Sequence, residues 1–161
     1  MTASKIKFLV IHCTATPEGR EVTSDQIRHW HTDPPPAGRG WKQVGYSDMI
    51  HLDGWLENLV PFDQDNLVDP EEVTNGATGY NSQSHHVVYV GGCGTDMKPK
   101  DTRTPDQKDT ILTYIRHMIQ RYPDILVCGH TQLDPGKACP SFNVMAFCLA
   151  NGVMAKNIYK P

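Results

Sequence analysis

Two histidines stand where short β-forming segments end, and a cysteine follows the second of them across a loop. His12 lies near the end of the apolar run 7–13, His130 follows the run 125–128, and Cys139 comes nine residues after His130. The carboxyl ends of strands are where binding sites form in open α/β sheets. Two imidazoles and a thiolate are suitable ligands for zinc, and a catalytic zinc keeps three protein ligands with water in the fourth position. The three residues therefore predict a zinc site with one open position.

Two other interpretations of these residues stay open at this point. His12 also fits a hydrogen-bonded core histidine and Cys139 a small buried hydrophobe, because free cysteine is among the most buried residue types. Alternatively, Cys139 with His130 would make a cysteine hydrolase, which thiol alkylation inhibits and chelators leave active. A zinc enzyme, in contrast, would lose activity to a chelator and regain it with zinc.

The strands and helices that position these residues follow from apolar runs and capping patterns. Residues 7–13, 86–90 and 125–128 are short β-rich runs, which predict buried strands. Thr23 with Gln26 forms a capping-box pattern, which predicts a helix over 23–31. Thr104, Pro105 and Gln107 predict a second helix from 104, with an apolar stripe at residues 111, 112, 115, 118 and 119, and residues 143–150 predict a third.

A hairpin is predicted between the first helix and the strand at 86–90. Two β-rich runs flank Asp53–Gly54 within residues 46–60, and this dipeptide favours a tight turn. We expect Tyr46 to open the first strand of the hairpin. After it, residues 61–79 lose periodicity and contain five acidic residues, which is typical of a long acidic surface loop.

The order of the elements predicts an α/β fold, with a central mixed β-sheet flanked by helices and the zinc site at the strand ends. We expect one domain over residues 1–161, with its core at about 6–150 and a short tail at 151–161. A chain of 161 residues can bury about two-thirds of its unfolded surface. It therefore does not need disulfides to fold.

Composition excludes several other classes of protein. Five cysteines at irregular spacing form neither a secreted disulfide framework nor a zinc ribbon, so a reducing compartment is expected. The N-terminus lacks the apolar stretch of a signal peptide, which predicts synthesis in the cytoplasm, and no run has the length of a membrane span. A net charge of −3 argues against nucleic acid as a partner. We also expect the protein to be a monomer.

An ordered series of short motifs runs through most of the chain. The motifs are IHCTAT at 11–16, QIRHWH at 26–31, VGYSDMI at 44–50, GYN at 79–81, YVGG at 89–92, TPDQ at 104–107, GH at 129–130 and KACPSF at 137–142. Over residues 6–150 the chain resembles the zinc-dependent N-acetylmuramoyl-L-alanine amidases, a family that includes small phage amidases and the peptidoglycan recognition proteins. Each motif alone is weak, but the ordered set is specific.

The resemblance implies an activity and a site. The family's zinc ligands map to His12, His130 and Cys139, and a tyrosine and a lysine that it assigns to catalysis map to Tyr46 and Lys137. The implied reaction is hydrolysis of the amide bond between N-acetylmuramic acid and L-alanine in peptidoglycan, as in a phage endolysin that reaches the wall by another route. There Tyr46 would orient the attacking water or accept its proton. The alternative is a peptidoglycan-binding module without catalysis.

Some conspicuous residues are expected to be structural. Trp30, Trp41 and Trp55 are interpreted as packing in the core or at its rim, and Cys13 and Cys148 as core.

One departure from the family pattern concerns three residues near the strand at 86–90. Many relatives carry a histidine three residues before GYN, where this chain has Gly76, whereas His85 and His86 precede an otherwise apolar strand. Adjacent strand residues point to opposite faces, so at most one of the two histidines can face the cleft and replace the missing one. The alternative is that both are ordinary polar residues at the start of a strand.

Overall fold

A five-stranded mixed sheet forms the centre of the fold and contains every strand that the sequence predicted. The computed structural model describes residues 2–161, and the strand order in its main sheet is β5-β4-β7-β2-β9. Strand β2 pairs in parallel with β7 and β9, β7 pairs in parallel with β4, and β4 and β5 form the antiparallel hairpin. The strands are β2 (Phe8–Cys13), β4 (Asp48–Ile50), β5 (Leu56–Asn58), β7 (Ser84–Tyr89) and β9 (Leu126–Gly129).

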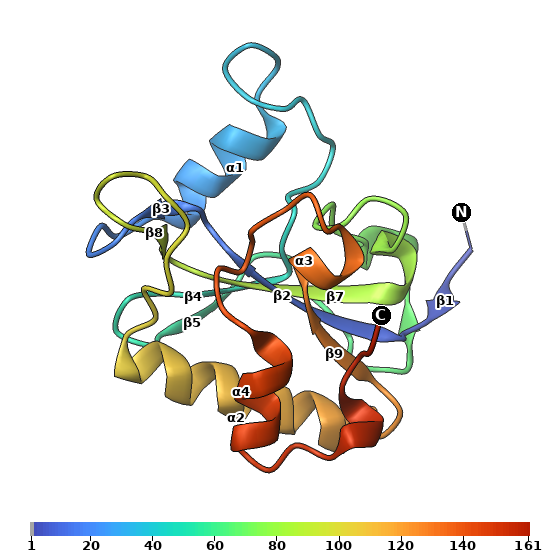
Figure 1. Cartoon of the computed structure of the whole chain (residues 1–161). Helices are drawn as coiled ribbons and strands as arrows, with labels where there is room; N and C mark the ends of the chain where they lie inside the picture. Colours follow the sequence, from blue (N-terminus) through green and yellow to red (C-terminus); the bar gives the residue numbers. More distant parts are fainter. Residues whose placement is uncertain (1) are drawn as a thin grey trace.

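Helices cover both faces of this sheet (Figure 1), which confirms the predicted α/β class. The capping boxes at Thr23 and Thr104 are both formed, and each begins the helix predicted after it. The first turn of α3, directly after β9, was not predicted. The helices are α1 (Ser24–Thr32), α2 (Pro105–Arg121), α3 (His130–Leu133) and α4 (Val144–Ala150), with 3-10 turns η1 (Pro70–Glu72), η2 (Asn81–Gln83) and η3 (Ala155–Asn157).

Strand β2 is buried along its whole length and sends alternate side chains to the two faces of the sheet. Leu9 and Ile11 belong to the cluster that includes α2 and α4, whereas Val10 belongs to a cluster on the other face. Burying one such side chain is worth about 1.5–3 kcal/mol. Cys13 and Cys148 are both in the first cluster, which confirms their prediction as core residues.

Tyr46 does not open a strand, so that prediction was wrong. Strand β4 begins at Asp48, and Tyr46 lies in the loop before it. The hairpin pairing stops there because the Asn58 side-chain amide donates to the Ser47 carbonyl and to Asp48 Oδ1, and the chain beyond Asn58 folds back toward Ser47.

The acidic segment 61–79 is more ordered than the sequence predicted. It contains β6 (Leu67–Val68), which pairs antiparallel with β1 (Ser4–Lys5), and the turn η1. The buried carboxylate of Glu72 accepts hydrogen bonds from the backbone N–H groups of Asp63 and Asp69. The pairing with the distant strand β1 and the local hydrogen bonds of Glu72 give the segment its structure, and neither leaves an apolar periodicity in the sequence.

Other differences concern packing at the edges of the fold. Residues 151–161, expected as a tail, contain Ile158, which is buried in the main core beside β9. Trp30 is 38% exposed and Trp55 is 58% exposed, so these two lie at the rim and not in the core. A short parallel pair not predicted joins β3 (Thr16–Pro17) to β8 (Gly92–Cys93).

Within residues 2–161, no helix combines the length and the apolar character that a membrane span requires.

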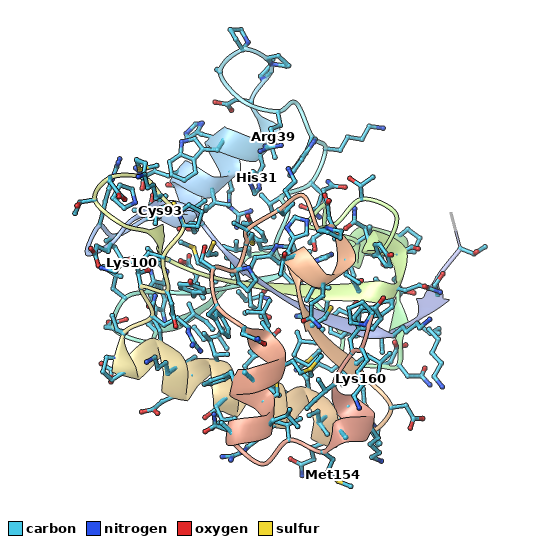
Figure 2. The ribbon with its side chains drawn as sticks, viewed as in Figure 1. His31, Arg39, Cys93, Lys100, Met154 and Lys160 are labelled. Atoms are coloured by element: carbon cyan, nitrogen blue, oxygen red, sulfur yellow. The ribbon has the colours of Figure 1, made fainter. Side chains whose placement is uncertain are left out.

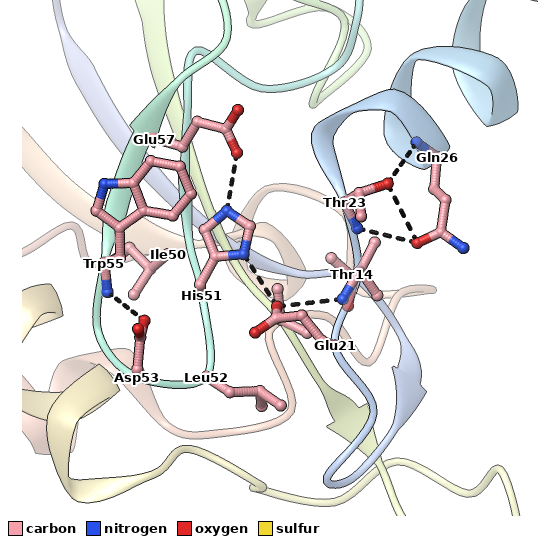
Figure 3. A network of polar contacts seen from close by, with 12 residues as sticks. Thr14, Glu21, Thr23, Gln26, Ile50, His51, Leu52, Asp53, Trp55 and Glu57 are labelled. Atoms are coloured by element: carbon pink, nitrogen blue, oxygen red, sulfur yellow. Dashed lines mark hydrogen bonds and ion pairs between the residues drawn. The ribbon is translucent and has the colours of Figure 1, made fainter.

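A histidine between two carboxylates ties the hairpin to the segment before α1 (Figure 3). Nδ1 of His51 lies 2.9 Å from Glu21 Oε1, and Nε2 lies 2.8 Å from Glu57 Oε1. The Trp55 ring stacks on the imidazole with centroids 4.7 Å apart. Burial alone would lower the pKa of His51, but the hydrogen bonds and negative charges of Glu21 and Glu57 outweigh burial and raise it.

This arrangement predicts a pH-dependent contribution of His51 to stability. Because its pKa is raised by folding, the contribution is complete below the unfolded pKa of about 6.5 and disappears as pH rises through the folded pKa. His51→Gln should therefore lower the melting temperature by about 2–4 °C at pH 6, the shift that about 1 kcal/mol produces in a domain of this size, and by less at pH 9. The exposed His117 gives a control, since His117→Gln should change neither value. An equal loss at both pH values would contradict the prediction.

Candidate metal centre

The side chains of His12, His130 and Cys139 converge at the carboxyl ends of β2 and β9. One ligand atom from each residue lies within 4.8 Å of the other two. His12 is in β2, His130 is the first residue of α3 directly after β9, and Cys139 comes from the loop after α3. Because β2 and β9 are parallel, their carboxyl ends meet at one edge of the sheet. The structure thus brings together the three residues that the sequence singled out.

The geometry of this group fits zinc. The Cys139 Sγ and the His12 Nδ1 are 3.6 Å apart. Two donors held by one tetrahedral zinc, at about 2.3 Å for sulfur and about 2.0–2.1 Å for nitrogen, are separated by about 3.6 Å. The Cys13 backbone N–H donates to Cys139 Sγ at 3.2 Å, an interaction that favours the thiolate form that binds metals.

Burial in the group is uneven. His12 is 1% exposed, whereas His130 and Cys139 are half-buried, so the group opens to solvent on their side. Burial lowers the pKa of both His12 and His130, and at His12 the neighbouring rings of His86 and His130 lower the pKa further. A neutral imidazole is the form that binds a metal. The Thr131 backbone N–H donates to the Cys139 carbonyl at 2.8 Å and holds the cysteine loop against α3.

Tyr46 lies beside the group. Its ring centroid is 5.1 Å from that of His12, and burial and the neighbouring thiols of Cys139 and Cys13 raise its pKa. The ring of His31, from α1, packs against Tyr46 at 5.2 Å. His31 Nδ1 accepts a hydrogen bond from the Gly45 backbone N–H at 3.0 Å, so α1 holds the loop that carries Tyr46.

His31 supports the Tyr46 loop, a role that its place in the motif QIRHWH did not indicate. It lies on α1 close to Arg39 (Figure 2). Burial and the positive charge of Arg39 lower the pKa of His31 to about 4. A neutral His31 leaves Nδ1 free to accept from the backbone, which is the bond observed.

Lys137 is exposed in the turn between α3 and Cys139, where its backbone N–H donates to the Asp134 carbonyl. Burial lowers the pKa of His130, Asp134 opposes this, and the Lys137 ammonium adds to the lowering. The Lys137 ammonium therefore disfavours the charged form of His130.

The two adjacent histidines point to opposite faces of the sheet, as strand alternation predicted. His86 is fully buried on the face of His12, and its Nδ1 lies 2.9 Å from His12 Nε2. His85 is on the other face, where its Nε2 lies 3.0 Å from Asp48 Oδ2. There it lines a cavity of about 630 Å³ between α2 and the β4–β5 hairpin, to which none of the three candidate ligands contributes. Of the two histidines, only His86 lies beside the candidate ligand group, through its contact with His12.

An arginine that sequence reasoning missed anchors the chain after Cys139. The guanidinium of Arg103 lies 3.4 Å from the ring centroid of Phe142 and 4.6 Å from that of Phe147. Two of its nitrogens donate to the Asp101 carboxylate at 2.9 and 3.0 Å. No spacing in the sequence connects residue 103 to residue 142, so only the folded chain shows this contact.

Comparison with known proteins places this geometry in a family. The family model described as N-acetylmuramoyl-L-alanine amidase matches residues 2–142. The chain is 34% identical to an endolysin of Enterobacteria phage K11 over 134 residues, which cover 83% of this chain and 80% of that endolysin.

Two solved structures share the fold. The N-acetylmuramoyl-L-alanine amidase LysC from Clostridium intestinale has a TM-score of 0.70 at 21% identity, covering 96% of this chain and 92% of LysC. Drosophila PGRP-LB has a TM-score of 0.66 at 19% identity, covering 99% of this chain and 91% of PGRP-LB. The family match over residues 2–142 and the similarity to the phage endolysin, with the convergence of the three candidate ligand residues, lead to one conclusion: the chain belongs to the N-acetylmuramoyl-L-alanine amidase family.

Proposed function

We propose that this protein is a zinc-dependent endolysin that hydrolyses the amide bond between N-acetylmuramic acid and L-alanine in peptidoglycan. The observation that carries the proposal is the convergence of His12, His130 and Cys139 in a chain of the amidase family. The similarity to a phage endolysin over most of both chains supports the biological role.

The three proposed ligands leave one coordination position for the reaction. A zinc ion held by the three residues would supply a nucleophilic water at neutral pH and would polarise the scissile carbonyl. The half-buried side of the group, formed by His130 and Cys139, is where the substrate amide can approach. The buried side, formed by His12, serves to fix the ligands.

Lys137 and Tyr46 are proposed to act on the substrate. As the amide carbonyl becomes tetrahedral, negative charge develops on its oxygen, and the Lys137 ammonium can stabilise that charge from the solvent side. The Tyr46 hydroxyl, on a ring packed against His12, can orient the attacking water by hydrogen bonding. In these roles both residues contribute to the rate without holding the metal.

Two alternatives are weaker on this geometry. A binding module without catalysis would not need a complete set of two histidines and one thiolate, and this chain retains all three. A cysteine nucleophile would need a thiol activated by a lowered pKa. The hydrogen bond with the Cys13 thiol and burial instead raise the pKa of Cys139, and they outweigh the lowering by the Cys13 backbone N–H.

The function is tested by incubating the protein with purified peptidoglycan, with and without a chelator, and identifying the new chain ends. We expect free L-alanine amino groups on the released peptides and intact N-acetylmuramic acid on the glycan. The chelator should abolish the release and added zinc should restore it. Release that persists in chelator but stops on thiol alkylation would favour the cysteine hydrolase, and binding without any new ends would favour the module.

The ligand assignment predicts the behaviour of two alanine variants. His12→Ala and Cys139→Ala should each lose stoichiometric zinc and the amidase activity, because each removes one of three ligands. Elemental analysis of the purified proteins measures the metal directly. Removing zinc from the wild type should also lower its melting temperature, since a ligand that binds only the folded state stabilises it. A variant that kept full zinc and activity would remove its residue from the ligand set.

The catalytic assignment predicts a different pattern. Lys137→Ala and Tyr46→Phe should keep zinc but lose turnover, by about 100- to 1000-fold for Lys137, the usual effect of deleting one oxyanion donor. The loss for Lys137 should appear mainly in kcat, because the charge it stabilises exists only near the transition state. Lys42→Ala, which removes a lysine outside the proposed site, is the control. Normal turnover of a zinc-loaded Lys137→Ala or Tyr46→Phe protein would exclude that residue from the mechanism.

A further inference from the structure

The hydrogen bond between His12 and His86 suggests how the first proposed ligand is held. The two residues are 74 positions apart, and His12 Nε2 lies 2.9 Å from His86 Nδ1. On the other side of its ring, His12 Nδ1 faces Cys139 Sγ at 3.6 Å. Each nitrogen of His12 therefore has a separate task.

The protons on these rings can be assigned from their partners. A nitrogen that holds a metal carries no proton, so with Nδ1 of His12 toward the metal its Nε2 carries the proton and donates to His86 Nδ1. The proton of His86 is then on Nε2, which lies 3.1 Å from Asn81 Oδ1. An amide oxygen can only accept, so the assignment is consistent along the whole row from Asn81 to His12.

The far end of this row is fixed by the backbone. Asn81 Oδ1 also accepts from the Ala77 backbone N–H at 2.8 Å, which ties the residue to the loop before it. His86 is 0% exposed and sits in β7, which pairs with β2 and β4 on its two sides. The His86 ring therefore has little freedom to move away from His12.

Gly76 leaves the space that the His86 ring fills. A Cβ atom on Gly76 would lie 2.4 Å from His86 Nδ1 and 2.6 Å from His86 Cγ, and 2.8 Å from the Gly45 carbonyl oxygen. The φ angle of Gly76 is not among the positive ones, so the backbone conformation alone does not require glycine there. The close approach of the His86 ring and of the Gly45 backbone does.

We propose that His86 is a positioning residue that orients His12 for metal binding, and that it occupies the space toward which a side chain at position 76 would point. The proposal rests on the zinc site proposed above. It explains the departure in the sequence, because a histidine at position 76 and a histidine at position 86 compete for one place beside His12. This chain fills that place from β7 and keeps glycine at 76.

Zinc affinity of the purified full-length protein tests the positioning role, by competition with a chromogenic chelator. His86→Ala should bind zinc about 10- to 100-fold more weakly, the usual effect of losing a partner of a ligand histidine. The control is His85→Ala, which removes the neighbouring buried histidine and its bond to Asp48. It should lower the melting temperature and leave zinc affinity within about twofold of the wild type.

Cobalt substitution gives a second measurement that a purely structural role would not change. The visible absorption of Co²⁺ in the site reports ligand geometry, so His86→Ala should alter the spectrum and His85→Ala should not. Asn81→Ala removes the end of the row without touching His86 itself and should weaken zinc binding in the same direction. It also serves if His86→Ala does not fold.

Position 76 is tested by a double-mutant cycle. Gly76→Ala should displace the His86 ring and weaken zinc binding, and in the His86→Ala background the same change should cost clearly less, because only the approach of its Cβ to the Gly45 carbonyl remains. Equal losses of zinc affinity from Gly76→Ala in the wild type and in the His86→Ala background would overturn the shared place and leave the positioning role.

The outcomes separate this proposal from the proposed function. A wild type that binds no zinc would overturn the proposed zinc site itself. A wild type that binds zinc, with His86→Ala and Asn81→Ala equal to it in affinity and in cobalt spectrum, would overturn only the role of His86.

Discussion

The site depends on a single imidazole that is held on both of its nitrogens. His12 is almost fully buried in the interior strand β2, with Cys139 near one nitrogen and His86 bonded to the other. The ring cannot rotate without losing one of these contacts. Strand β2 has parallel neighbours on both sides. On one side β7 carries His86, and on the other side β9 ends next to His130, at the same edge of the sheet as His12. The order of the strands in the sheet is therefore what assembles the group.

The two faces of the sheet have different tasks, and strand alternation separates them. One face packs against α2 and α4 through a large apolar cluster, and its buried polar residues, such as His85 and Asp48, satisfy each other. The other face carries His12, a proposed ligand, and its hydrogen-bond partner His86. A shift of one residue in the register of β7 would exchange the two histidines and destroy both arrangements. Packing and function are thus fixed by the same pairing.

Loops carry most of the proposed reactive groups, and each loop is fastened to a regular element. His31 on α1 accepts a hydrogen bond from the loop of Tyr46. Arg103, just before α2, packs on Phe142 and so fixes the chain that follows Cys139. These anchors matter because misplacement of a reacting group by about 1 Å can cost about 100-fold in rate. Residues far in sequence from the proposed ligands therefore help to fix the positions of the proposed reactive groups.

The sequence by itself determined the local elements and the identity of the candidate ligands. The capping boxes at Thr23 and Thr104 and the Asp53–Gly54 turn are local signals, because the groups that bond lie within a few residues of one another. Only the tertiary structure decided that Tyr46 lies outside the hairpin, that part of the acidic segment pairs with the N-terminal strand β1, and that His86, not His85, faces His12. Those outcomes depend on contacts between residues tens of positions apart. Alternation along a strand predicts that two neighbours face opposite ways, but which one faces the site is set by register with strands elsewhere in the chain.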